Sequence, residues 1–262
     1  MKDGETMPSR KLVMEGIVIV LSILLAFAID AYWEERQEAS NTRQSIEVVR
    51  RDLVDALEQL DGFDQFLAEI AMASVEGARA LAGPEPVAAA DRPQIESLLQ
   101  RSNFRMTMRL PRAGYTDLLG TGNLAQVDNA ALRNSIVQFY EAADRSQEII
   151  EKNSAIYTDK VLNDAIVTSG LLLPIPREGD SFDSIDLITR RNEVFRELIG
   201  PDFSTRPARL WRLPMDSPEV ERIVSALLAN ARVALTGQLI ARETHDKASE
   251  VIRQLDEYLA DN

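Results

Sequence analysis

The stretch LVMEGIVIVLSILLAFAI runs from Leu12 to Ile29 and holds a single charged residue, Glu15. From Gly16 onward its side chains are apolar all around a helix, except for Ser22. A helix rises about 1.5 Å per residue, so a stretch of this length spans roughly 27 Å, close to the hydrocarbon core of a bilayer. The stretch therefore predicts one membrane-spanning helix.

The residues on either side suit the lipid headgroups. Tyr32 and Trp33 follow the stretch, and aromatic rings with a polar tip are typical of the boundary between lipid and water. Arg10 and Lys11 precede it. Glu15 comes four residues after Lys11, on the same helix face, where it can pair with the lysine or contact a partner within the bilayer. We therefore assign all five residues to the membrane interface.

Two other interpretations of the stretch are open. Ala26-Phe27-Ala28 fits the small-x-small cleavage site of a signal peptide. Against cleavage, the residues before the stretch include Asp3 and Glu5, and the sequence after the motif continues as a good helix. A buried core helix is the second alternative, but it needs polar side chains on one side, and this stretch offers one serine.

The flanking charges favour a cytoplasmic N-terminus. Arg10 and Lys11 lie next to the stretch at one end, whereas Asp30, Glu34 and Glu35 lie at the other. Basic residues are enriched on the cytoplasmic side of membrane helices. Arginines also occur shortly beyond the far end, so the reverse orientation stays open.

The remainder of the chain is long enough for one large domain or two small ones. Apolar residues make up 45% of the whole chain and charged residues 27%, as expected where a core is buried. We expect three parts. They are a short N-terminus (1–11), the transmembrane helix (12–33) and a helical domain (34–262).

Apolar residues recur every three or four positions in three long segments, the pattern of helices that pack through a seam. The first helix is expected over 10–81, the second over 129–169 after Asp128 as its cap, and the last over 218–260 after Ser217. The expected seams are Ile46, Val49, Leu53, Ala56, Leu60, Phe63, Leu67 and Ile70; Leu132, Ile136, Phe139, Ala143, Ile150, Tyr157 and Val161; and Val220, Val224, Leu227, Ala231, Ala234, Gln238, Ala241, His245, Ala248, Ile252, Leu255 and Leu259.

Shorter helices are expected between these segments, over 113–119, over 183–199, and from the cap Asp91 to about residue 102. Long amphipathic helices cannot each bury an apolar stripe alone, so they must pack together or against another chain. The predicted fold class is all-α, with a single N-terminal transmembrane helix that continues into an elongated helical bundle.

Two parts of the sequence carry a resemblance. They are Arg10-Lys11, Ile17-Val18-Ile19-Val20-Leu21 and Ala31-Tyr32-Trp33-Glu34; and Gly114-Tyr115-Thr116-Asp117-Leu118, Gly122-Asn123-Leu124, Leu132-Arg133-Asn134 and Phe139-Tyr140. Together they resemble an uncharacterised family of bacterial single-pass membrane proteins that has no assigned activity. The resemblance covers roughly residues 10–40 and 113–141. It implies the bacterial inner membrane, with the helical domain periplasmic or otherwise extracytoplasmic, and it carries over no catalytic residue.

The composition argues against several kinds of partner and chemistry. The net charge is −13, which repels phosphate backbones and disfavours a nucleic-acid partner. The chain has no cysteine, which excludes disulfides, thiolate catalysis and cysteine metal sites. His245 is the single histidine, and no HExxH motif is present, so we expect no metal and no cofactor.

Three further patterns have ordinary explanations. The G-x-G-x-x-A match that begins at Gly120 lacks the strand of a dinucleotide site, so we expect a turn with a glycine at positive φ. Asp180, Asp183 and Asp186 could share a face and bind calcium, but they fit helix capping better. His245 is expected to be a hydrogen-bonded core histidine, with a pH-sensitive role as the alternative.

Two arginine clusters are the one local signal for a ligand. The first holds Arg101, Arg105, Arg109 and Arg112; the second holds Arg206, Arg209 and Arg212, around Trp211. Guanidinium groups bind carboxylate or phosphate in a forked geometry. Candidate ligand or partner residues are Arg105, Arg109, Arg112, Arg209, Trp211 and Arg212. The alternative, in so acidic a chain, is that they pair with its own carboxylates.

These patterns predict a membrane-anchored interaction or scaffold protein rather than an enzyme. Its partners would be the lipid bilayer and either another protein or a second copy, bound through the helical seams. The alternative is an extracytoplasmic ligand-sensing domain. Eleven residues before the membrane are too few for an output domain, so such a sensor would act through a membrane partner.

Overall fold

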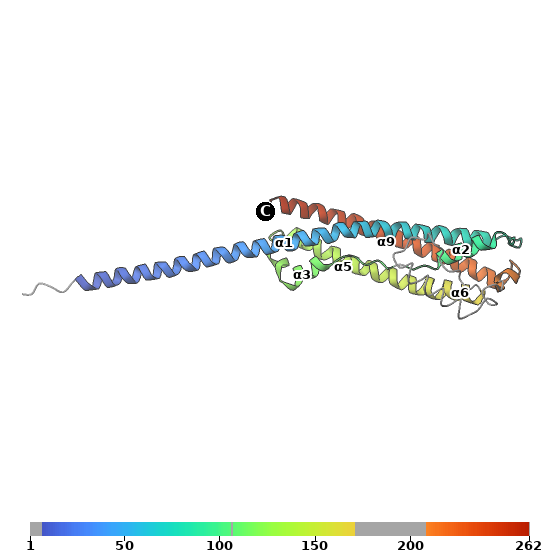
Figure 1. Cartoon of the computed structure of the whole chain (residues 1–262), viewed down its shortest axis with the longest axis horizontal. Helices are drawn as coiled ribbons and strands as arrows, with labels where there is room; N and C mark the ends of the chain where they lie inside the picture. Colours follow the sequence, from blue (N-terminus) through green and yellow to red (C-terminus); the bar gives the residue numbers. More distant parts are fainter. Residues whose placement is uncertain (1–6, 106, 171–207, 262) are drawn as a thin grey trace, which may run out of the picture. The chain divides into compact units, whose positions relative to one another are not determined.

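The computed structural model describes residues 7–105, 107–170 and 208–261, with side chains from residue 14 onward. Within these ranges the chain is helical and contains no strand, so the prediction of an all-α fold with a long N-terminal helix is confirmed. Figure 1 shows the long helices α1, α5 and α9. The helix expected over 183–199 lies outside the described residues, as do Asp180, Asp183, Asp186 and Arg206.

The helices follow the sequence pattern closely at most of their ends. They are α1 (Met7–Leu81), α2 (Arg92–Ser102), α3 (Ala113–Gly120), α4 (Asn123–Gln126), α5 (Ala130–Asn153), the π-helix η1 (Ser154–Leu162), α6 (Asn163–Thr168), the 3₁₀ helix η2 (Arg209–Arg212) and α9 (Pro218–Asp261).

The described chain divides into two compact units. The first comprises the described residues up to Val54, Pro111–Val137 and the chain from Glu250 onward, and the second comprises the described residues of Asp55–Leu110 and Gln138–Ser249. The helices α1, α5 and α9 contribute residues to both units.

In the first unit, α3 lies against α1. Ile46, Val49 and Leu53 of the expected seam are fully buried. Gly114 makes the contact with α3 possible, because a Cβ there would lie 2.6 Å from the backbone nitrogen of Val49. The backbone N–H of Gly114 donates a 2.6 Å hydrogen bond to Asp52 Oδ2. A glycine is therefore required where the two helices approach.

Ser45 of α1 forms hydrogen bonds with α3 and with the start of α4. Ser45 Oγ donates to Asp117 Oδ2 at 3.2 Å and accepts from Asn123 Nδ2 at 3.0 Å. Gly122 adopts φ 79°, which confirms a glycine at positive φ in the G-x-G-x-x-A segment. Gly114, Asp117 and Asn123, which carry part of the family resemblance, are thus residues that contact α1.

Replacement of Gly114 by alanine is expected to lower the free energy of unfolding by about 1–3 kcal/mol, because backbone atoms of α1 would have to move. Gly237→Ala is the control. Its Cβ would meet Leu67 Cδ1 at 2.7 Å, but that atom ends a flexible side chain. Urea unfolding in detergent would measure both. An equal loss in the two variants would contradict the close approach of α3 to α1.

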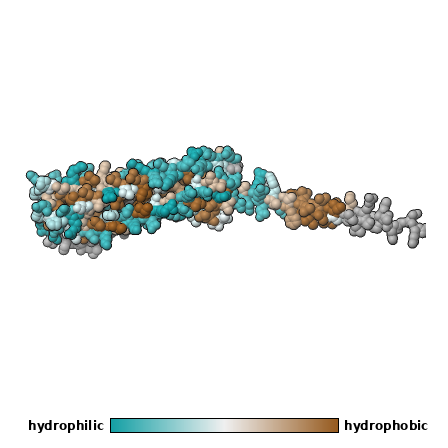
Figure 2. Space-filling model, turned by 180° about the vertical axis from the view of Figure 1, so that it is seen from behind, coloured by the Kyte–Doolittle hydropathy of each residue, from teal (hydrophilic) through white to brown (hydrophobic). Residues whose placement is uncertain are grey.

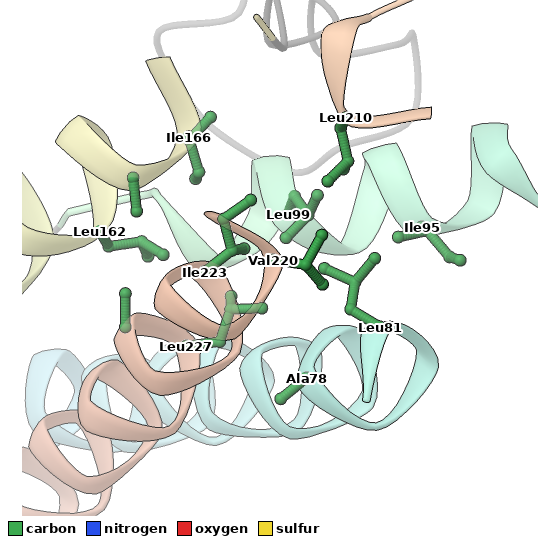
Figure 3. Packing of buried hydrophobic residues seen from close by; sticks show 12 residues of the cluster. Ala78, Leu81, Ile95, Leu99, Leu162, Ile166, Leu210, Val220, Ile223 and Leu227 are labelled. Carbon is green, nitrogen blue, oxygen red and sulfur yellow. The ribbon is translucent and has the colours of Figure 1, made fainter. Parts of the chain in front are cut away.

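In the second unit the largest cluster of the described residues joins six helical elements. It contains Ala78 and Leu81 of α1, Ile95 and Leu99 of α2, Leu162, Ala165 and Ile166 around the junction of η1 and α6, Leu210 of η2, and Val220, Ile223, Ala226 and Leu227 of α9 (Figure 3). The side chains point toward one another from all of these elements. Removing this surface from water stabilises the unit at roughly 25 cal/mol per Å².

The start of α9 is as predicted, and its buried face is wider than predicted. Ser217 Oγ accepts a 3.4 Å hydrogen bond from the N–H of Val220, as a cap does. Most expected seam residues are buried, but Val224, His245, Ile252 and Leu259 are half-buried. Buried residues outside the expected seam include Ile223, Ala226, Asn230, Thr244 and Val251. A helix that packs against several neighbours buries a broader stripe than a coiled-coil seam.

The seam predicted for the second long helix is wrong at its end. Tyr157 and Val161 are 38% and 40% exposed, whereas Thr158 and Leu162 are buried. The reason is η1, because the i→i+5 hydrogen bonds of a π-helix widen each turn and shift the buried face by one residue.

Two predicted caps also need correction. The helix after Asp128 begins one residue later, so Asn129 Oδ1 accepts from the N–H groups of Ala131 and Leu132 at 3.0 and 3.1 Å. Asp91 occupies the cap position of α2, but its side chain makes no cap hydrogen bond. Its backbone is helical (φ −91°, ψ −15°), whereas a capping side chain needs extended backbone.

Candidate functional site

The apolar part of α1 is exposed around its whole circumference. Every described residue from 14 to 41 is exposed, and the five successive residues Ile17–Leu21 are each 50–60% exposed. Figure 2 shows this part of α1 as a continuous hydrophobic band. In water such a surface is costly, at roughly 25 cal/mol per Å² of apolar area. The band is therefore a candidate membrane segment.

Two described helices are long and apolar enough to cross a membrane, α1 from Met14 onward and α9. They differ in how much of the apolar stretch is covered by the chain itself. None of the stretch in α1 is buried, whereas 44% of the stretch in α9 is buried. The apolar residues of α9 are thus partly explained by a protein core, and those of α1 are not.

The predicted interface residues lie at the two ends of the band. Tyr32 and Trp33 are 58% and 65% exposed. The hydroxyl of Tyr32 accepts a 3.2 Å hydrogen bond from Arg36 Nη1, which holds a cation beside the aromatic pair. Glu15 is exposed at the other end. Arg10 and Lys11 belong to α1, but their side chains lie outside the described ones, so the pairing of Lys11 with Glu15 stays a prediction.

Two of the four candidate arginines of the second unit lie beside carboxylates of the chain. Arg105 forms an ion pair with Asp159 of η1, and Arg209 pairs with Glu219 of α9 at 3.5 Å. Arg109 and Arg212 are exposed. Arg112 belongs to the first unit, where it precedes α3. The pairings of Arg105 and Arg209 favour a structural role for these two over an open anion site.

Trp211 is a packing residue. Its indole Nε1 donates a 2.7 Å hydrogen bond to Glu96 Oε1, and its ring contacts the largest cluster. The guanidinium of Arg92 lies 5.5 Å from the ring centroid, within the range of a cation–π interaction. These contacts fix η2 on α2.

A buried polar group in the second unit escaped the sequence patterns. Asn230 of α9 is 1% exposed and accepts a 2.7 Å hydrogen bond from Thr158 Oγ1. Its Nδ2 donates to Ser74 Oγ at 3.2 Å and to the carbonyl of Ser102 at 2.8 Å. One asparagine thus links α1, the end of α2, η1 and α9. The signal that could have identified it is an amide side chain within an apolar part of the last helix.

A cavity lies beside this group, lined by Asn230, Thr158, Arg105, Phe66 and Phe104 among others. Its volume of about 30 Å³ fits a single water molecule. Polar side chains that line it, Thr158, Asn230 and Arg105, also make the contacts that connect η1 to its neighbours. The cavity therefore suits a buried water better than a metabolite.

Thr158→Val is expected to lower the free energy of unfolding by about 1–3 kcal/mol. The buried side-chain oxygen Oδ1 of Asn230 loses its hydrogen-bond donor, whereas valine keeps the shape of the threonine side chain. Thr168→Val is the control, since Thr168 is exposed and its hydroxyl bonds to the carbonyl of Asp164 within one helix. Thermal unfolding by circular dichroism would compare them. Equal stability of the two variants would contradict a role for the Asn230 group.

His245 is half-buried rather than a core residue, so the prediction that it lies in the core is wrong. Its Nε2 lies 3.7 Å from Asp61 Oδ1. Its neighbour Arg242 makes a two-pronged contact with Asp64, at 2.9 and 3.1 Å. The predicted seam ran through this position, but the buried face of α9 here is centred on Ala241, Thr244 and Ala248.

An exposed ion cluster near the end of α9 lowers the pKa of Glu250, and its contribution to stability therefore depends on pH. Glu250 accepts hydrogen bonds from Arg253 and Gln254, which lower its pKa from 4.5 to about 2. Because the folded pKa lies below the unfolded one, this carboxylate stabilises the helix above pH 4.5, and the contribution is lost as the pH falls toward 2. Carboxyl NMR should show the Glu250 pKa rising toward 4.5 in Arg253→Gln. An unchanged pKa would contradict the contact.

A scan against protein-family models finds no match, and neither do the searches of curated proteins and of solved structures. The resemblance to a family of bacterial single-pass membrane proteins therefore stays a prediction. What the chain offers as a functional element is the exposed apolar band of α1, flanked by polar and aromatic residues and continuous with a helical part.

Proposed function

We propose that residues 12–33 anchor the chain in a membrane and that the helical part acts by contact with another protein. The exposure of the apolar band of α1 on all sides carries this proposal. A water-soluble chain would cover such a band, and lipid covers it at no cost. No catalysis is part of the proposal.

The finer placement follows from the flanking charges. We propose a bacterial inner membrane, a cytoplasmic N-terminus and a periplasmic helical part, because Arg10 and Lys11 directly precede the band and acidic residues directly follow it. The acidic net charge suits a domain that stays in solution beside an anionic bilayer rather than lying on it.

A role in binding proteins is favoured over ligand sensing at two of the sites described above, the cavity beside Asn230 and the pair Arg105 and Arg209. The cavity beside Asn230 has room for about one water molecule. Arg105 and Arg209 already have carboxylate partners. An anion that bound at these two arginines would have to displace the carboxylates. A thermal-shift screen against small anions tests it, and a shift that Arg209→Ala abolishes would favour the sensor instead.

Cysteine mapping tests the anchor and its orientation, since the native chain has no cysteine. Single cysteines at Ser9 and Gln37 would be treated in intact spheroplasts with a membrane-impermeant maleimide. We expect labelling at position 37 alone, and labelling at position 9 only after lysis. Labelling at position 9 alone in intact cells would reverse the orientation. Recovery of the full-length chain in the soluble fraction would contradict the anchor itself.

A further inference from the structure

The outer face of α9 carries a second apolar seam that the described chain leaves uncovered. Leu228, Leu235 and Leu239 are 52%, 51% and 66% exposed. In sequence order, Leu228, Arg232, Leu235 and Leu239 are spaced by four, three and four residues, so they lie on one stripe of the helix. These four residues are called the outer seam. It lies on the flank of α9 beside the buried face that Ala231, Ala234 and Gln238 form.

The α9 segment that carries the outer seam has a charge opposite in sign to that of the whole chain. The whole chain has 42 acidic residues and a net charge of −13, yet no acidic residue occurs from Arg222 to Arg242. The charges within this segment are three arginines. Arg242 is held by Asp64 of α1, whereas Arg232, in the middle of the seam, has no ion pair in the part of the chain that the structure describes.

We propose that the outer seam binds an acidic amphipathic helix of another protein. A narrow stripe with heptad spacing fits one helix, whose apolar residues would cover the three leucines. A carboxylate of that helix would pair with Arg232 and compensate its charge at the interface. The proposal names the partner class for the protein contact proposed above, and it rests on that function.

A second copy of the chain fits the seam less well. A parallel pair of α9 helices from two copies would place Arg232 against its own counterpart, and like charges disfavour such pairing. The α1 helix of a second copy is another possible occupant, because its exposed face in the second unit carries Glu58, Glu69 and Glu76. The large apolar residue on that face is Met72, so the face would leave most of the three leucines without apolar contacts. A lipid surface would need a broader apolar stripe than one seam.

Two synthetic helices of about three heptads test the proposal, with leucine at the seam positions and either glutamate or lysine beside them. Fluorescence anisotropy would measure their binding to the full chain in nanodiscs of neutral lipid. The net charge alone predicts that the basic peptide binds better. We expect the acidic peptide to bind at least about tenfold more tightly, because the seam itself is positive.

Variants locate the binding. Arg232→Glu should reverse the preference between the peptides, Leu235→Glu should abolish binding of both, and Met72→Ser on α1 should leave both unchanged. Circular dichroism would verify that each variant is folded. Equal binding of the two peptides, or binding that Leu235→Glu does not weaken, would overturn the proposal. A dimer that Leu235→Glu dissociates, or binding to protein-free vesicles that it abolishes, would assign the seam to a second copy or to lipid. None of these outcomes affects the cysteine mapping of the membrane anchor, because that experiment measures only where the chain is located. Failure of the outer seam and failure of the anchor can therefore be told apart.

Discussion

Replacement of Leu21 and Leu24 by arginine is expected to release the chain from the membrane. Both side chains are exposed in the apolar band of α1, at 59% and 58%. An arginine at the centre of a membrane helix costs about 2.5–3.5 kcal/mol on insertion scales, so the pair costs roughly 5–7 kcal/mol. This is enough to change the distribution of the protein between membrane and aqueous fractions by orders of magnitude.

The matched control adds the same two charges outside the band. Gln37 and Asn41 are exposed on the same helix and also lie about one turn apart. Gln37→Arg with Asn41→Arg should leave the protein in the membrane fraction after alkaline extraction. If both double variants stay in the membrane equally, the band does not anchor the chain.

Leu99→Ala is expected to lower the free energy of unfolding by about 2–5 kcal/mol. Leu99 of α2 is fully buried in the largest cluster, together with side chains of α1, η1, α6, η2 and α9. Its removal leaves a cavity where these elements meet, and α2 is too short to hold its place without that contact. Chemical unfolding in detergent would measure the loss.

Leu119→Ala provides the comparison for this prediction, because Leu119 is 49% exposed and its truncation leaves no cavity. A surface truncation of this kind costs less than about 0.5 kcal/mol. A Leu99 variant as stable as the Leu119 variant would mean that the cluster does not hold α2 in place.

The long helices were predictable because their signals are local. The apolar band, the heptad spacing from Ile46 to Ile70 and the Ser217-Pro218 start of α9 all depend on residues near one another in sequence. The end of α1 at Leu81 was likewise set by the glycine and prolines that follow it.

Features that depend on contacts between distant segments were not predictable. The π-helix η1 places Thr158 against Asn230, which is 72 residues away, and so moves Tyr157 to the surface. The pairing of Arg105 with Asp159 joins residues 54 apart, which is why the arginine cluster looked open in the sequence. The close approach of Gly114 to α1 also required the folded arrangement.

A spin-label scan of residues 17–29 in lipid bilayers tests the membrane anchor most directly, since single cysteines can be placed in a chain that has none. Collision rates with oxygen and with a water-soluble nickel reagent would be measured at each position. We predict high oxygen and low nickel accessibility at every position, without helical periodicity. High nickel accessibility along the scan, or an oscillation of 3.6 residues with one protected face in protein, would contradict the account.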